Sequence, residues 1–404
     1  MGGCTACPGA TISKLKKITL LGSTGSIGQS ALDVIRRWPD RFRVYALVAG
    51  RNVELLARQI SEFQPEFAAV ESATDARKLA QLLPSECRTE ISFGPQARVR
   101  AATAEPVDFV LSAIVGVAGL EATYRAVQVG KTIGLANKEV LVACGELVMK
   151  AAADSKAQLI PIDSEHNGLH QCLRAGRREE VVRVLLTASG GPFRETPLHL
   201  FPSIKPQQAL QHPTWKMGQR ITIDSATMMN KGFEVIEACW LFGLKPSQVE
   251  VVIHPQSTVH ALVEFVDGSF MLQASTTDMR MPIQYALTYP ERISAPVASL
   301  SWEKARTWEF YPPEEARFPL LKLAYEALRT GGSAGCVLNA ADEVAVQAFL
   351  NHEISFPQIA DVIRHTLDRV PHAQPASVEE VMDIDRQARA LARQSIERAS
   401  TVRV

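Results

Sequence analysis

Short apolar runs alternate with amphipathic stretches over the first 163 residues of the chain. The stretches between the runs, such as 30–38 and 53–62, repeat apolar residues at helical spacing. Strands and helices that alternate in this way form a parallel sheet covered on both faces. We therefore predict a doubly wound, Rossmann-type α/β domain over residues 1–163, with strands at 18–21, 44–48, 67–70, 90–93, 109–112, 132–135 and 159–162.

The pattern changes after residue 163. A strand-like run at 181–187 ends in a Gly-Gly-Pro string, and roughly thirty residues with several prolines and little periodicity follow, which is typical of a lid or binding loop. Further strands are predicted at 249–253, 260–266 and 270–274, and the Asp267-Gly268 turn pair joins the last two into a hairpin. We predict a central α+β domain over 164–290, a linker over 291–314 and a C-terminal helical domain over 315–404, with helices at 320–328, 338–350, 357–370 and 378–397.

The composition is that of a globular protein, with 46% hydrophobic and 21% charged residues. Lys+Arg and Asp+Glu both total 43, which argues against a nucleic-acid or anionic-membrane partner. Seven scattered cysteines and the lack of a membrane-spanning apolar run favour a cytoplasmic protein with reduced thiols. Cys4 and Cys7 form a CxxC pair in residues 1–14, which we interpret as a flexible tail, with a metal or redox role as the alternative.

Three glycines, Gly22, Gly25 and Gly28, follow the first predicted strand and open the first helix. Glycines at such a turn let the backbone approach a pyrophosphate, which the helix N-terminus attracts through its free N–H groups. This context favours a dinucleotide site over a merely structural turn. Arg51 follows the second strand, where an NAD site would carry an acid, and an arginine there suits the 2′-phosphate of NADP. A solvated surface arginine is the alternative.

Asp163 and Glu165 close the last strand of this predicted domain. If the strand continues through them, residues at i and i+2 project to the same side and both carboxylates face one point. Paired acids need a cation or a shared proton between them, and oxygen ligands suit Mg²⁺ or Mn²⁺. The alternative is a strand end followed by a helix N-cap, with two solvated acids.

Asn137, Lys138 and Glu139 stand where another strand gives way to a helix, at the sheet edge where ligands of open α/β sheets bind. A lysine there can offer a positive charge to a substrate oxygen. A helix capped by Asn137, with Lys138 and Glu139 exposed, is an equally good interpretation of these residues alone.

Ser225, Asn230 and Lys231 are hydroxyl, amide and ammonium donors set before or on a predicted helix N-terminus, a combination that suits a phosphate monoester. Glu234 lies one turn after Lys231 and could face the same ligand. The alternative is Ser225 as an N-cap, with Lys231 and Glu234 as an ion pair on a wet surface.

The irregular stretch contains His212, Trp215, Met217 and Gly218, which we interpret as part of a lid over residues 212–218 that covers a polar substrate and excludes water. Trp215 could instead be an anchor packed on the core. His166 and His170 have the spacing of a helical metal pair, but no HExxH pattern accompanies them. We therefore interpret both histidines as ordinary helix residues.

Taken together and in order, these motifs resemble the 1-deoxy-D-xylulose 5-phosphate reductoisomerase family from about Lys16 onward. The Asp-Ser-Glu string at 163–165 and the Met-Met-Asn-Lys-Gly string at 228–232 are far more specific than the glycine loop. Family members often carry Lys where this chain has Arg51, which keeps the charge. Asp342 stands where the family pattern has Asn, at a position we assign to structure, and residues 1–14 have no counterpart.

The resemblance implies a homodimeric enzyme that uses NADPH and a divalent metal (Mg²⁺, Mn²⁺ or Co²⁺) to isomerise and reduce 1-deoxy-D-xylulose 5-phosphate to 2-C-methyl-D-erythritol 4-phosphate in the non-mevalonate route to isoprenoids. The metal ligands would be Asp163, Glu165 and Glu234. The catalytic residues would be Lys138, Asp163, Glu165, Glu234 and His212. The sugar phosphate would contact Lys138, Ser164, Glu165, Ser189, His212, Trp215, Ser225, Asn230, Lys231 and Glu234. The NADPH site would be lined by Thr24, Gly25, Ser26, Ile27, Gly50, Arg51, Asn52, Asn137, Glu139, Met217 and Gly218.

In the implied reaction the metal would act as a Lewis acid while the carbon skeleton breaks and rejoins, by retro-aldol and aldol steps in the version we prefer, before NADPH reduces the aldehyde. One alternative is another metal- and NADP-dependent dehydrogenase, which oxidises and decarboxylates a hydroxy acid. The other is an NADP-sensing regulatory module without chemistry, against which the presence of all three acids argues.

Overall fold

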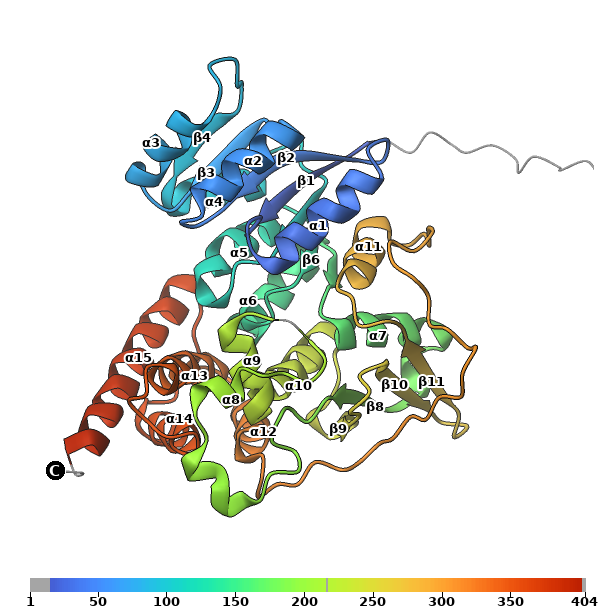
Figure 1. Cartoon of the computed structure of the whole chain (residues 1–404), viewed down its shortest axis with the longest axis vertical. Coiled ribbons are helices and arrows are strands. Elements are labelled where there is room, and N and C mark those ends of the chain that lie inside the picture. The colour runs from blue at the N-terminus through green and yellow to red at the C-terminus, as the bar shows by residue number, and fades with distance from the viewer. Residues whose placement is uncertain (1–14, 216, 402–404) are drawn as a thin grey trace, which may run out of the picture.

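The computed structural model describes residues 15–215 and 217–401 (Figure 1). The predicted N-terminal tail, with Cys4 and Cys7, and Lys216 of the predicted lid lie outside the described residues. Three parts follow one another along the chain: an α/β layer, a smaller mixed sheet with its helices, and a group of C-terminal helices. No helix among the described residues is both long and apolar enough to cross a membrane.

A seven-stranded parallel sheet forms the first part, in the order β4-β3-β2-β1-β5-β6-β7. Every strand predicted for this region is present: β1 Lys16–Leu21, β2 Phe42–Val48, β3 Phe67–Val70, β4 Glu90–Phe93, β5 Phe109–Ser112, β6 Thr132–Leu135 and β7 Leu159–Pro161. Their residues are apolar throughout because both faces of the sheet are buried. In β5, for example, Val110 packs on one face while Phe109 and Leu111 pack on the other.

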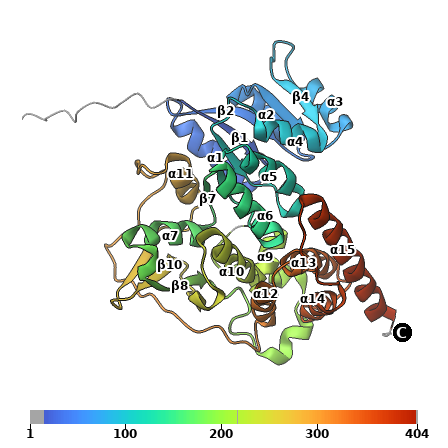
Figure 2. The same cartoon turned by 180° about the vertical axis from the view of Figure 1, so that it is seen from behind.

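Helices cover both faces of this sheet (Figures 1 and 2). They are α1 Ser26–Arg37, α2 Val53–Phe63, α3 Ala73–Leu82, α4 Gly94–Thr103, η1 Gly116–Gly119, α5 Leu120–Gln128 and α6 Glu139–Ser155. The glycine loop opens the first helix as predicted, because α1 begins at Ser26 with Gly25 as its N-cap residue, and the amphipathic run predicted from residue 30 continues it to Arg37. The predicted doubly wound α/β architecture is confirmed.

The chain reverses its direction across the sheet between β1 and β5. Strands β2 to β4 extend the sheet on one side of β1, and β5 to β7 extend it on the other. The loops after β1 and β5 therefore diverge and leave a crevice at the carboxyl ends of the strands, which is where open α/β sheets bind ligands. The ends of β6 and β7, which lead to Lys138 and Asp163, open toward the same edge.

A four-stranded sheet forms the second part, in the order β11-β10-β8-β9. Its strands are β8 Val181–Ala188, β9 Val249–Ile253, β10 Val259–Phe265 and β11 Phe270–Ala274, and β10 runs antiparallel to both of its neighbours. The predicted hairpin is confirmed. Helices α7 Ser164–Cys172 and α10 Met229–Phe242 pack on this sheet and share one hydrophobic cluster with it. The sheet thereby fixes the helices that carry Glu165 and Glu234.

The predicted irregular segment is more helical than expected. It contains η4 Leu198–Ser203, α8 Pro206–Ala209 and α9 Gln219–Thr227. Prolines at 197, 202 and 206 hide these short elements from any test of periodicity. Met228, in the left-handed conformation with φ 63°, ends α9, and α10 begins directly after it.

The four C-terminal helices are present as predicted: α12 Pro319–Thr330, α13 Ala334–Leu350, α14 Gln358–Arg369 and α15 Val378–Thr401. Helix α11 Arg280–Thr288 packs against α1, so it lies beside the first sheet (Figure 1). The remaining short turns are η2 Leu173–Ala175, η3 Arg178–Glu180 and η5 Pro246–Gln248. The division into domains at 163, 290 and 314 stays a prediction.

Candidate active site

The carboxyl ends of the first sheet face α9 and α10 across a cavity of about 750 Å³. The glycine loop, the lid and both of these helices contribute to its wall. Most of the predicted site residues line it together: Ser26, Ile27, Asn137, Lys138, Glu139, Asp163, Ser164, Glu165, Ser189, His212, Trp215, Met217, Gly218, Ser225, Asn230, Lys231 and Glu234. Segments far apart in the sequence thus meet at one cavity.

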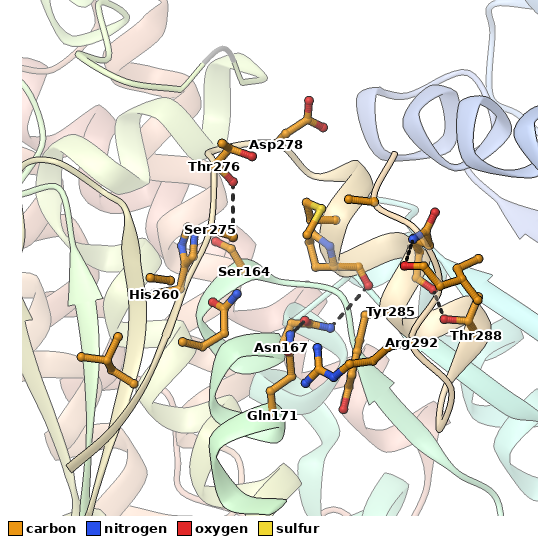
Figure 3. A pocket seen from close by; sticks show the side chains of 18 of the residues that line it. Ser164, Asn167, Gln171, His260, Ser275, Thr276, Asp278, Tyr285, Thr288 and Arg292 are labelled. Atoms are coloured by element: carbon orange, nitrogen blue, oxygen red, sulfur yellow. Dashed lines mark hydrogen bonds between the residues drawn. The ribbon is translucent and has the colours of Figure 1, made fainter. Parts of the chain in front are cut away.

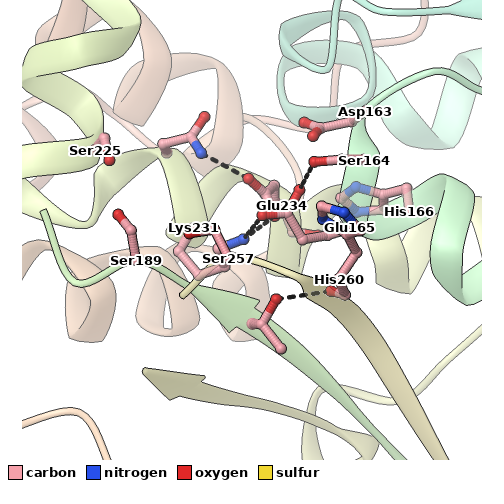
Figure 4. A network of polar contacts seen from close by, with 12 residues as sticks. Asp163, Ser164, Glu165, His166, Ser189, Ser225, Lys231, Glu234, Ser257 and His260 are labelled. Carbon is pink, nitrogen blue, oxygen red and sulfur yellow. Dashed lines mark hydrogen bonds and ion pairs between the residues drawn. The ribbon is translucent and has the colours of Figure 1, made fainter. Parts of the chain in front are cut away.

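Asp163, Glu165 and Glu234 form the group that we call the carboxylate cluster (Figure 4). Their side chains are 15%, 16% and 0% exposed. The predicted strand geometry is wrong: β7 ends at Pro161, Asp163 is the N-cap residue of α7, and Glu165 lies in its first turn. The alternative of a helix start is right for the backbone, but the acids are not solvated.

Two buried lysines lie between these acids. The Lys138 ammonium pairs with Asp163 and lies 2.8 Å from Asn230 Oδ1 and 3.3 Å from Glu234 Oε1. The Lys231 ammonium lies 2.9 Å from Glu165 Oε1 and also pairs with Glu234. The alternatives of an exposed Lys138 and of a wet Lys231–Glu234 pair are therefore wrong.

The electrostatics of the cluster follow from burial and these pairings. Burial, reinforced by the charge of Glu165, raises the pKa of Glu234 to about 7, although both lysines oppose the shift. Burial acts on Asp163 in the same direction, but Lys138, His166 and Lys231 together outweigh it and hold the pKa of Asp163 below its usual range. The acids raise the pKa of both lysines despite burial. Three acids thus surround two ammonium groups.

The donors of this cluster fit a hard divalent cation. Asp163, His166 and Glu234 each offer a ligand atom, and these atoms lie within 4.8 Å of one another. His166 is the weaker candidate, because its Nε2 lies 2.8 Å from the main-chain oxygen of Glu234 and must donate to it, while Nδ1 faces Glu237 at 3.4 Å. Carboxylate oxygens therefore remain as the candidate metal ligands. The Lys138 ammonium lies between Asp163 and Glu234, where a divalent metal ion could bind instead.

Ser189, His212 and Ser225 form a second group, which we call the hydroxyl site. His212 Nε2 lies 3.0 Å from Ser189 Oγ and 3.1 Å from Ser225 Oγ. His212 Nδ1 accepts from the main-chain N–H groups of Thr214, at 3.2 Å, and Trp215, at 3.0 Å, so the ring proton is on Nε2. Burial lowers the pKa of His212. The site therefore offers neutral donors to an anion.

Helices α9 and α10 place the other predicted phosphate donors differently. Ser225 lies near the C-terminal end of α9, so the interpretation of Ser225 as an N-cap is wrong. Asn230 and Lys231 lie in the first turn of α10, as predicted. In this structure both point to the carboxylate cluster, since Asn230 Nδ2 donates to Glu234 Oε1 at 2.6 Å and Lys231 contacts Glu165.

The glycine loop leaves the N-terminus of α1 open. Gly22 has φ 93°, and a Cβ atom on Gly28 would lie 2.3 Å from the Gly22 oxygen, so only glycine fits the turn. Asn137 does not cap α6, because Lys138 is the N-cap residue. Instead, Asn137 Nδ2 donates to the main-chain oxygen of Gly116 at 2.9 Å and to that of Ile114, which fixes the loop after β5.

The predicted adenosine end of the nucleotide site lies outside this cavity. Gly50 and Arg51 are exposed at the end of β2, and Asn52 Oδ1 accepts from the Leu55 N–H at 3.1 Å, which caps α2. These three residues, with Thr24 and Gly25, do not line the cavity. The glycine turn and the Arg51 turn follow adjacent strands, so an extended dinucleotide could reach both.

Family models match three stretches of the chain. Residues 18–145 match 1-deoxy-D-xylulose 5-phosphate reductoisomerase, and residues 159–242 and 274–391 match its C-terminal domains. The reductoisomerase of Solibacter usitatus is 59% identical over 385 residues, which are 94% of this chain and 97% of that protein. The chain belongs to the 1-deoxy-D-xylulose 5-phosphate reductoisomerase family. The reductoisomerase of Cellvibrio japonicus is 50% identical over 95% of this chain and 99% of that protein.

Solved structures of the reductoisomerase family share the whole fold. The Zymomonas mobilis enzyme in complex with NADPH is 43% identical and has a TM-score of 0.90, over 95% of this chain and all of that one. A reductoisomerase in complex with NADPH, fosmidomycin and magnesium is 40% identical with a TM-score of 0.89, over 95% of this chain and 98% of that one. The predicted family and enzyme class are thereby confirmed.

Some residues that line this reductoisomerase site were not predicted from the sequence. Ser257, His260 and Met279 line the cavity. Ser257 lies in a tight turn between β9 and β10, held by His254, whose Nε2 accepts from the N–H groups of Thr258 and Val259 at 3.2 Å each. The His-Pro-Gln-Ser string at 254–257 was the available signal, since a polar loop at a strand end often carries function.

A smaller cavity of about 340 Å³ adjoins the first, between α7, α11 and β11 (Figure 3). Asn167, Gln171 and Tyr285 line it. It shares Trp215 with the larger cavity, so this lid residue lies between the two. The charged and ligand-like groups gather in the larger cavity, which is therefore the candidate active site.

Proposed function

We propose that this chain catalyses the metal-dependent, NADPH-linked conversion of 1-deoxy-D-xylulose 5-phosphate to 2-C-methyl-D-erythritol 4-phosphate. Membership of the reductoisomerase family gives the reaction. One observation on this chain carries the proposal: a single cavity joins the start of α1, the carboxylate cluster and the hydroxyl site. A nicotinamide, a divalent cation and a phosphorylated sugar could meet there.

Asp163, Glu165 and Glu234 would hold the metal. When bound, the metal supplies a Lewis acid for the oxygens of the ketone and the adjacent hydroxyl. Lys138 lies against Asp163 and Glu234, so its ammonium can donate to the same sugar oxygens once a cation balances these acids. Ser164 stands between the two acids of α7 and offers a further hydroxyl.

The hydroxyl site would hold the substrate phosphate. Ser189, Ser225 and the Nε2–H of His212 supply neutral donors, and Asn230 and Lys231 supply an amide and a charge from the first turn of α10. Contacts between an ammonium and a phosphate are among the stronger hydrogen bonds in proteins. Trp215 would close the cavity from the lid and exclude water.

NADPH would bind across the ends of the first sheet. Thr24, Gly25, Ser26 and Ile27 lead into the N-terminus of α1, which suits the pyrophosphate. The turn after β2, with Arg51, suits the 2′-phosphate. The nicotinamide end would lie near the remaining predicted residues, Asn137, Glu139, Met217 and Gly218, which line the cavity.

The test is NADPH oxidation with deoxyxylulose phosphate, measured with and without Mg²⁺, Mn²⁺ or Co²⁺. We expect consumption only with both substrate and metal present, and methylerythritol phosphate as the product. Turnover of a hydroxy acid with NADP⁺ instead would identify the rival dehydrogenase. NADPH binding without any turnover would favour the sensing module.

We further propose that the chain forms a homodimer through β11. This strand lies at the edge of the four-stranded sheet, and its outer side pairs with no strand of the described residues. Phe270, Met271 and Leu272 are 44%, 43% and 44% exposed, three consecutive large apolar side chains on one edge. Exposed apolar edges invite strand pairing, so the β11 of a second copy could join the two sheets.

Leu272→Lys should therefore shift the protein to monomers, because the lysine charge would be buried in the interface between the two β11 strands. Light scattering after size exclusion measures the mass. Val266→Lys is the matched control, since Val266 is 68% exposed on the hairpin turn and away from the edge. A monomeric wild type, or an undisturbed Leu272→Lys dimer, would contradict this interface. The cytoplasmic location stays a prediction.

A further inference from the structure

A second cluster of buried charge lies where α9 meets α6 and α13. Arg220 of α9 is its centre: Nη1 lies 3.2 Å from Glu139 Oε1 and 2.9 Å from Glu343 Oε1, and Nη2 lies 3.4 Å from Asp342 Oδ2. We call Glu139, Arg220, Asp224, Asp342 and Glu343 the Arg220 cluster. It connects the helix that follows the lid to the C-terminal helices (Figure 1).

Asp224 and Asp342 are the deepest acids of this cluster, at 4% and 0% exposure. Asp224 Oδ2 is 3.6 Å from Arg220 Nε, too far for a hydrogen bond. The Oδ1 atom of each acid is buried with no donor from the described residues. Both carboxyl groups lie beside the same guanidinium, with Asp342 Oδ2 at 3.4 Å from Arg220 Nη2. An ionised carboxylate only accepts hydrogen bonds, so two ionised acids buried here would leave both Oδ1 atoms charged and unpaired, and a proton on one of them removes that cost.

The surroundings do not supply enough positive charge to ionise both acids. Helix α6 contributes Glu139, and α13 contributes Glu343 together with the neutral Asn339, which accepts from Arg220 at 2.9 Å. From α15, Arg389 lies 2.7 Å from both Glu343 and Asp385, so it does not reach the pair.

Among the residues that the structure describes, only Arg220 therefore offsets the charge of Asp224 and Asp342. Burial and the charge of Asp342 raise the pKa of Asp224 well above its ordinary value. Burial raises the pKa of Asp342 to about 6, although Arg220 opposes it.

We propose that Asp224 and Asp342 share one proton in the folded protein, and that this pair positions Arg220 and the start of α9 behind the hydroxyl site. Arg220 follows Gly218 of the lid by two positions, and Asp224 directly precedes Ser225. Loss of the proton would place two repelling charges between α9 and α13, next to the hydroxyl that receives the phosphate. Both acids are positioning residues that act through Arg220 and Ser225, although Asp224 also lines the cavity.

The sign of the pH effect follows from linkage. In the unfolded chain both acids titrate near pH ~4, so they hold no proton above about pH 5. The folded pair keeps one, and its stabilising contribution is lost as pH rises through the raised pKa of the pair. Between the unfolded pKa of the acids and the raised pKa of the folded pair, the folding equilibrium constant should therefore fall by about ten-fold per pH unit.

Asp342→Asn tests the proposal, because the amide has the same shape and donates to Asp224 without a shared proton. We expect the variant to fold and to lose the one-proton slope of stability against pH, measured by denaturant unfolding between about pH 5 and pH 9. Its KM for deoxyxylulose phosphate should also rise less at high pH than that of the wild type. Asp385→Asn is the control: this acid is equally buried but paired with Arg389, and its slope should match the wild type.

Equal slopes in the wild type and Asp342→Asn would overturn the shared proton. So would the failure of both Asp342→Asn and Asp224→Asn to fold, since either amide supplies a donor in place of the shared proton. The KM readout rests on the proposed function, but the unfolding readout does not. A changed slope in a protein without reductoisomerase activity would count against that function and support the shared proton.

Discussion

The carboxylate cluster and the Arg220 cluster are built from similar groups, yet they differ in what can move between the acids. Lys138 and Glu139 are neighbours in sequence, but Lys138 points into the first cluster and Glu139 into the second. The first cluster lies on the cavity and holds two lysines. The second reaches the same cavity through Glu139, Arg220 and Asp224, but it is also packed against α13 through Asp342 and Glu343, and it holds one arginine.

The pKa values show the consequence. The Lys138 ammonium pairs directly with Asp163 and, together with His166 and Lys231, outweighs burial, so the pKa of Asp163 falls. Arg220 is shared among several acceptors and stays 3.6 Å from Asp224, so burial prevails and the pKa of Asp224 rises. The Lys138 ammonium is on a flexible side chain and can move aside for a divalent cation. The planar Arg220 guanidinium is fixed by several acceptors at once and cannot. A surplus of buried acid thus serves chemistry in one place and positioning in the other.

Glu234→Gln should have the largest effect, because it removes a carboxylate that the carboxylate cluster needs to hold a metal. The Arg220 cluster does not contain Glu234 and should stay intact. We expect kcat to fall by about 100-fold or more, as for loss of other preorganised charges in active sites, with a weaker response to Mg²⁺ or Mn²⁺. Fluorescence titration should show NADPH binding unchanged. Near-wild-type kcat with an ordinary metal response would remove Glu234 from the metal site.

Lys231→Ala tests whether Lys231 contacts the substrate phosphate or only the carboxylates during turnover. If it turns from Glu165 and Glu234 to the phosphate, the KM for deoxyxylulose phosphate should rise by about 10-fold through loss of a charge-assisted contact. Lys150→Ala on the exposed side of α6 is the control and should change nothing. A fall in kcat with KM unchanged would leave Lys231 with the carboxylates alone.

The sheet could be predicted because its signal is local. Parallel strands buried on both faces are apolar throughout, as in the Phe-Val-Leu run of β5, and glycines at a strand end mark the nucleotide turn. The start of α7 could not be fixed in the same way. Asp163 and Ser164 serve equally well as the end of a strand or the start of a helix, and the contacts that decide come from α6 and α10.

Burial of charge was the harder problem, because residue type alone predicts exposure for lysine and aspartate. Lys138 is buried because Asp163 and Glu234, from other parts of the chain, surround it. The Asp224–Asp342 pair joins two helices with no shared motif, so no spacing in the sequence indicates it. Such pairs depend on tertiary packing and appear only in the folded structure.

Arg51→Glu extends the comparison to a charge that is not buried at all. Arg51 is exposed after β2, and solvent screens exposed charges, so its reversal should have the smallest effect of the three. We expect the KM for NADPH to rise by ~5-fold, because a 2′-phosphate would meet a like charge, while the KM for deoxyxylulose phosphate stays unchanged. Arg58→Glu makes the same charge change further along α2 and should be silent. Equal rises in the KM for NADPH and the KM for deoxyxylulose phosphate would contradict this prediction. They would indicate that the substitution disturbs the first sheet in general and that the 2′-phosphate lies elsewhere.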